Sequence, residues 1–160
     1  MKIAKIINNN VVSTCDEEGR EIIVMGRGVG FKAKEGSTID EEKVEKIFRL
    51  ESQNTMDKFK ELLENLPMEH VQISAEIIGY AKEVLNRPIN PNVYITLTDH
   101  INFALERYKQ KMMFSNPLIR EVRSFYHAEY LIGEYAIAMI ERDLGVKLPV
   151  DEAASIALHI

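Results

Sequence analysis

Two strands and the turn between them are predicted by residues 11–25, which read VVSTCDEEGREIIVM. Residues 11–15 and 21–25 are five-residue runs rich in β-branched side chains, which is typical of strands. Residues 16–19 between them read DEEG, and Asp and Gly tolerate the backbone of a tight hairpin turn. Residues 3–7 form a similar run, joined to Val11 by three asparagines. This part of the chain is therefore predicted to be an antiparallel sheet.

A fourth strand is predicted at residues 44–50, although residues 40–47 would also suit the start of a helix. Four short strands without a helix to cover them would be marginally stable alone. We therefore expect the sheet domain, residues 1–56, to dimerise.

Helical spacing begins after the polar joint at residues 51–55. Apolar side chains then recur every three or four positions, as at Phe59, Leu62, Leu63 and Leu66. Pro91 and Pro117 each follow an asparagine and suit the first turns of helices over about 91–112 and 117–144. Gly145 suits a C-terminal cap, and Pro149 would open one more helix. The fold class predicted is a two-domain α+β protein, with an all-α bundle of about five helices at residues 57–160.

Composition restricts the possible functions. The 160 residues suffice for one ordinary domain or two small ones, and 20 basic against 25 acidic side chains give a formal charge of −5. Any nucleic-acid contact must therefore come from a local patch. Cys15 is the single cysteine, and we find neither a signal peptide nor a membrane-spanning stretch in the sequence, so we expect a cytoplasmic protein without membrane partners.

A glycine-rich loop, MGRGVGFK at residues 25–32, is the first candidate site. It departs from the dinucleotide-binding fingerprint because Phe31 stands where that fingerprint needs a glycine. Gly26 would let a ligand approach the backbone, Arg27 offers a forked donor and Phe31 a face on which a base could stack. A glycine bulge that only bends a strand is the alternative.

The asparagines Asn8 and Asn10, with Lys5 nearby, are the second candidate. Their carboxamides can donate to and accept from base edges, which suits the recognition of unpaired bases. Ordinary turn chemistry is the alternative interpretation.

Histidines are the third candidate. His100 and His159 lie in helical, apolar surroundings without a second His or Cys at the spacing of a metal site, so we expect no metal and no other cofactor. Asp99 is adjacent to His100, but neighbouring helix residues do not face each other. A packed histidine with satisfied hydrogen bonds is the alternative, and it is our expectation for His70 and His127.

Four motifs follow one another along the chain: MKIAKIINNNVV at the N-terminus, VMGRGVGF at residues 24–31, LTDHINFA at residues 97–104 and DEAASIALHI at residues 151–160. Together they resemble the BglG/SacY family of bacterial transcriptional antiterminators. The resemblance extends over the whole chain.

This resemblance implies a non-enzymatic RNA-binding protein. In the family, a dimeric sheet domain stabilises a hairpin in the nascent mRNA leader and so prevents formation of a terminator. The RNA-contacting positions correspond to Lys5, Asn8, Asn10, Gly26, Arg27 and Phe31. Two helical regulation domains normally follow, phosphorylated on histidines by the sugar phosphotransferase proteins HPr and enzyme II. His100 and His159 match the first such domain, and Asp99 completes its Asp-His pair.

The resemblance further implies control of a β-glucoside operon, and the end of the chain at Ile160 suggests a fragment without the second regulation domain. Two rivals remain open. One is a phosphohistidine carrier enzyme, which would need polar partners near the histidine, where Ile101, Phe103, Leu158 and Ile160 indicate a packed interface. The other is a dimerisation module whose sheet binds protein or DNA.

Overall fold

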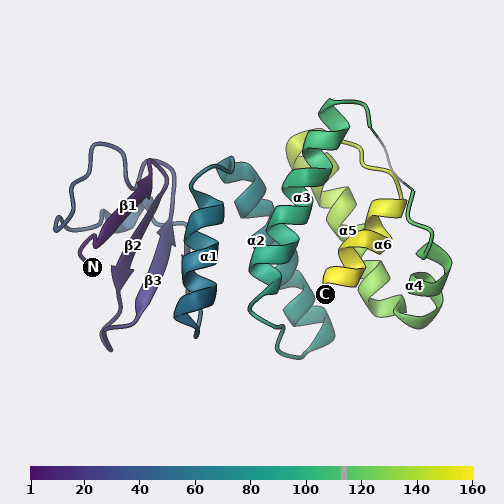
Figure 1. Ribbon diagram of the computed structural model, residues 1–160, viewed down its shortest axis with the longest axis horizontal. Coiled ribbons are helices and arrows are strands. Elements are labelled where there is room, and N and C mark those ends of the chain that lie inside the picture. The colour runs from purple at the N-terminus through teal and green to yellow at the C-terminus, as the bar shows by residue number, and fades with distance from the viewer. Residues whose placement is uncertain (113–114) are drawn as a thin grey trace. The chain divides into compact units, whose positions relative to one another are not determined.

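A computed structural model describes residues 1–112 and 115–160. The chain divides into two compact units, Met1–Leu66 and Pro67–Ile160. Strands and one helix build the first unit and helices the second (Figure 1). Each unit is described separately below.

The first unit contains the predicted antiparallel sheet, with strand order β1-β2-β3-β4. The strands are β1 (Lys5–Asn8), β2 (Val11–Cys15), β3 (Glu21–Met25) and β4 (Lys46–Phe48). Val11 pairs with Met25 and Cys15 with Glu21, which confirms the hairpin predicted from residues 11–25. The region that suited either a strand or a helix contains both, because a short 3-10 turn, Glu41–Lys43, precedes β4. Asp40 caps that turn by accepting from the N–H of Glu42.

Both faces of the sheet are covered within the first unit. On one face Val12 and Val24 pack with Ile3, Val29 and Ile39, all of them buried. On the other face lies helix α1 (Gln53–Leu63), which runs beside β3 (Figure 1).

Helix α1 is attached to the sheet by apolar and polar contacts. The rings of Phe48 and Phe59 meet edge to face with centroids 5.0 Å apart. Lys60 Nζ lies 2.9 Å from a carboxylate oxygen of Glu21 on β3. The expectation that no helix covers the sheet is therefore wrong, because residues 53–63, assigned in part to the helical domain, pack on the strands instead. Dimerisation consequently needs support other than an uncovered sheet.

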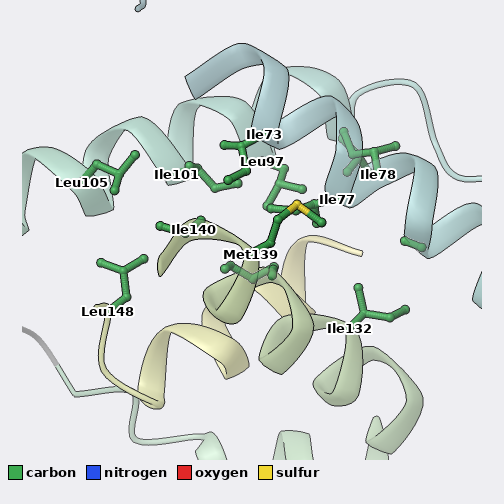
Figure 2. Packing of buried hydrophobic residues seen from close by; sticks show 14 of the residues in the cluster. Ile73, Ile77, Ile78, Leu97, Ile101, Leu105, Ile132, Met139, Ile140 and Leu148 are labelled. Atoms are coloured by element: carbon green, nitrogen blue, oxygen red, sulfur yellow. The ribbon is translucent and has the colours of Figure 1, made fainter. Parts of the chain in front are cut away.

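Five helices form the second unit, whereas the five predicted over residues 57–160 included the one with Phe59, which belongs to the first unit as α1. They are α2 (Met68–Leu85), α3 (Val93–Lys109), α4 (Ile119–Phe125), α5 (His127–Leu144) and α6 (Asp151–His159). Their core is mainly aliphatic, and Figure 2 shows Ile77 of α2, Leu97 of α3 and Met139 of α5 grouped together within it. Gly145 ends α5 with φ of 67°, which confirms the predicted cap.

One predicted helix is divided in two. Residues 117–144 were expected to form a continuous helix, but Tyr126 has φ of −129° and ψ of 52° and separates α4 from α5. The amphipathic pattern continues through this corner because both helices bury residues in one cluster, including Val122 and Tyr130. Periodicity therefore indicated the buried face but not the break.

Within the described residues, we find no helix with both the length and the apolar character needed to cross a membrane.

Candidate functional sites

The asparagine turn (residues 8–10) and the glycine loop (residues 26–31) lie against each other at one end of the sheet. Three hydrogen bonds join them: the N–H of Gly26 donates to the Asn10 carbonyl oxygen at 2.9 Å, that of Gly30 to the Asn9 carbonyl oxygen at 2.8 Å, and that of Gly28 to Asn10 Oδ1 at 2.9 Å. Two segments separated in sequence therefore form one surface, which we call the turn-loop surface.

Two of the predicted contact residues have clear roles in the fold. Asn8 donates from Nδ2 to the Leu63 carbonyl oxygen at 3.1 Å, and its Oδ1 accepts from the N–H of Asn10 at 2.8 Å. Gly26 is buried, and a Cβ built there would lie 1.8 Å from the carbonyl oxygen of Lys43. The turn chemistry that was the alternative interpretation is thus present at Asn8, and Gly26 is needed where two backbone segments approach closely.

The remaining predicted residues offer groups to a ligand. Phe31 is 55% exposed, and Lys32 Nζ lies 5.4 Å from the centre of its ring. Lys5 and Arg27 are exposed, while Asn10 is partly buried. Among the described residues, the hydrogen bonds of Asn10 use its backbone and Oδ1, which leaves its Nδ2 donors for a ligand. An aromatic face, cations and an amide donor together suit a nucleobase and its phosphates.

A second site, the histidine cluster, comprises His100 and Arg107 on α3 with Glu152 and His159 on α6. The Nε2 atom of His100 lies 2.9 Å from Glu152 Oε2, and Arg107 Nη2 lies 2.8 Å from Glu152 Oε1. Only 7% of the Glu152 side chain is exposed, so one buried carboxylate binds both the His100 imidazole and the Arg107 guanidinium. The members on each helix are seven residues apart, which places them on one face, two turns from each other.

The two histidine rings of the cluster are neighbours. Their centroids are 4.8 Å apart, and the rings are tilted by 38°. The pKa of His159 lies below its usual value because burial disfavours the charged ring; the neighbouring His100 adds to this, whereas Asp99 and Glu152 act in the opposite direction. A neutral imidazole retains a lone pair, so His159 is suited to act as a nucleophile at neutral pH.

Sequence reasoning found the two histidines but missed Glu152 and Arg107. The seven-residue spacings from His159 and His100 could have indicated them. Asp99 is exposed, and Glu152 is the carboxylate bonded to His100.

The other two histidines differ from each other. His70 is buried, with Nδ1 2.8 Å from Asn102 Oδ1, as expected of a satisfied core histidine. His127 is exposed at the start of α5, so the prediction that it is packed is wrong.

Apolar side chains near the cluster also divide into two kinds. Ile101 is buried, whereas Phe103 and Leu158 are 57% and 51% exposed. The guanidinium of Arg107 lies over the Phe103 ring, 4.6 Å from its centre. Among the described residues, no group of three or more His, Cys, Asp or Glu side chains could hold a metal ion.

Comparisons with known proteins match both units. The family model of the CAT RNA binding domain matches residues 1–57, and that of the PRD domain matches residues 75–160. Transcription antiterminator LicT of Bacillus subtilis (strain 168) is 47% identical over the 160 residues, as is the Beta-glucoside operon antiterminator of Dickeya chrysanthemi. The chain spans 58% and 56% of the lengths of these relatives.

A solved structure supports the same assignment. The crystal structure of GlcT CAT-PRDI matches with a TM-score of 0.83 at 34% identity, covering 99% of this chain and 94% of that one. The match includes the sheet unit and the helical unit in the same order. With its CAT RNA-binding domain followed by a PRD domain, the chain therefore belongs to the BglG/SacY family of antiterminators.

Proposed function

We propose that this chain is the RNA-binding and first regulatory part of an antiterminator. As a homodimer, it stabilises a hairpin in a nascent mRNA leader so that the overlapping terminator does not form. The observation that carries this proposal is the turn-loop surface, which groups exposed Phe31 and Arg27 beside the asparagine turn inside the part matched by the CAT RNA binding model. The relatives named antiterminators favour regulation over catalysis.

RNA recognition in this proposal depends on stacking and hydrogen bonds. Phe31 stacks on an unpaired base, Asn10 donates to a base edge, and Lys5 and Arg27 meet phosphates. Asn8 and Gly26 act by shaping the surface. The Asn8 side chain donates to the Leu63 carbonyl oxygen, and the carbonyl of Lys43 leaves no room for a side chain at Gly26. This keeps all six predicted residues in the site while assigning two of them an indirect role.

Regulation in this proposal resides in the histidine cluster. HPr and a sugar-specific enzyme II phosphorylate His100 and His159, with Asp99 as the neighbouring residue of the motif, and a β-glucoside is the inducing sugar. Each phosphoryl group adds close to two negative charges beside the exposed apolar side chains Phe103 and Leu158. Repulsion and desolvation then oppose association of two copies through this face.

A gel shift tests the RNA half. We expect Phe31→Ala to weaken binding to the leader hairpin by about 1–3 kcal/mol, or about 5- to 150-fold, because a stacked base loses its platform. Phe125→Ala is the matched control, since Phe125 is 79% exposed on α4 of the other unit.

The nucleic acid itself is the second control in this experiment. A DNA duplex of the same sequence should bind much more weakly than the RNA hairpin. Equal affinity for RNA and DNA, or an unchanged affinity of a folded Phe31→Ala variant, would contradict the proposed surface.

Labelling tests the regulatory half. Incubation with phosphoenolpyruvate, the general phosphotransferase proteins and the sugar permease should label the wild type, while His100→Ala/His159→Ala should lose the label because both acceptors are gone. His70 and His127 remain in that variant as internal controls. Label that persists in the double variant would refute this assignment and favour another acceptor.

A further inference from the structure

The two ring nitrogens of His100 have different surroundings. Nε2 lies 2.9 Å from Glu152 Oε2, and no hydrogen bond of Nδ1 is found among the described residues. A carboxylate accepts hydrogen bonds, so the nitrogen that faces it carries the hydrogen. The neutral ring of His100 is therefore the tautomer with Nε2–H and a lone pair on Nδ1.

Glu152 is also bound by a second side chain, which keeps it in place against Nε2 of His100. Its other oxygen, Oε1, accepts from Arg107 Nη2 at 2.8 Å, and the side chains of Glu152 and Arg107 are 7% and 13% exposed. A group arriving from solution would reach Nε2 only by separating Glu152 from a partly buried imidazole. Removing one hydrogen-bond partner from a buried carboxylate in this way is unfavourable.

We propose that Nδ1 of His100 is the atom that accepts the phosphoryl group, with Glu152 as the positioning residue that fixes the tautomer. This inference rests on the proposed function, in which His100 is phosphorylated. Beyond that function, the inference identifies Nδ1 as the reacting atom and Glu152 as the residue that selects it.

The transfer balances without loss of a proton from His100. The Nδ1 lone pair forms the new N–P bond, while the P–N bond to the phosphohistidine of the donor protein breaks and its electron pair returns to the donor ring. The hydrogen on Nε2 stays in place, so the His100 ring becomes positively charged. The Glu152 carboxylate, 2.9 Å from Nε2, stabilises that charge as it develops.

Nitrogen NMR of the whole chain tests the acceptor atom. Long-range ¹H–¹⁵N spectra of protein labelled in its four histidines report each ring nitrogen before and after phosphorylation by phosphoenolpyruvate and the general phosphotransferase proteins. Before the reaction, we expect His100 to show a lone pair on Nδ1 and a hydrogen on Nε2. After it, coupling to ³¹P should appear on Nδ1.

The possible failures are distinguishable. Phosphorus coupling on Nε2 of His100 would overturn the choice of atom and leave the proposed function intact. A His100 that never carries label would contradict both. A lone pair found on Nε2 before the reaction would refute the tautomer directly, whatever happens on phosphorylation.

A pair of variants tests Glu152. In Glu152→Gln the amide can either accept from or donate to the ring, so we expect His100 to become a mixture of tautomers and the rate of labelling to fall. Glu106→Gln is the control. Glu106 lies on α3, the helix that carries His100, and it is half exposed and pairs with Lys109. The same single tautomer in folded Glu152→Gln would show that Glu152 does not position the ring.

Discussion

Glu152→Ala is expected to destabilise the helical unit by about 3–5 kcal/mol, because it removes one partner of a largely buried ion pair between Arg107 and Glu152. Arg107 Nη2 and Glu152 Oε1 are 2.8 Å apart, and their side chains are 13% and 7% exposed. Urea unfolding followed by far-ultraviolet circular dichroism measures the loss. Glu141→Ala removes an exposed carboxylate from α5 and should change the free energy of unfolding by less than about 0.5 kcal/mol.

Replacing both partners separates the cost of removing one partner alone from the contribution of the ion pair to stability. Arg107→Met/Glu152→Leu should recover much of the stability lost in Glu152→Ala, since apolar residues of similar volume often replace a buried ion pair without loss. It should not restore labelling of His100 at the wild-type rate. A single-variant loss below about 1 kcal/mol would contradict the buried ion pair between α3 and α6.

Gly133→Ala and Gly79→Ala should have opposite effects on stability. A Cβ on Gly133 of α5 would lie 2.0 Å from the carbonyl oxygen of Ala153 on α6, and neither backbone can move without separating the helices. We expect a loss near or above the upper end of the ~1–3 kcal/mol typical of overpacking. A Cβ on Gly79 of α2 meets no atom within 4 Å, so alanine there should stabilise the helix by up to about 1 kcal/mol.

Thermal unfolding of the two variants beside the wild type provides the measurement. Gly133→Ala should also disturb the histidine cluster, because Glu152 and His159 are carried by the helix that it displaces. Equal midpoints for Gly133→Ala and Gly79→Ala would show that α5 and α6 do not approach as closely as described.

Local signals predicted the strands and most of the helices. Alternation of β-branched residues and short polar turns indicated β1, β2 and β3, and the glycine at position 145 indicated the end of α5. Helix α1 was misassigned because its buried face, with Phe59 and Leu63, has the same periodicity whether it packs on a sheet or on other helices. Periodicity reports that a face is buried and does not report which partner covers it.

The sequence by itself determined the fold class and the family, and it indicated the turn and loop residues and the two histidines as candidate site residues. Those depend on local propensity, periodicity and motifs within short stretches. Only the tertiary structure decided that Asn8 and Gly26 support the turn-loop surface, and that Glu152 rather than Asp99 faces His100. Glu152 is 52 residues from His100 in the chain, and their contact depends on how α3 packs against α6. Such pairing is set by packing between helices, which no single segment encodes.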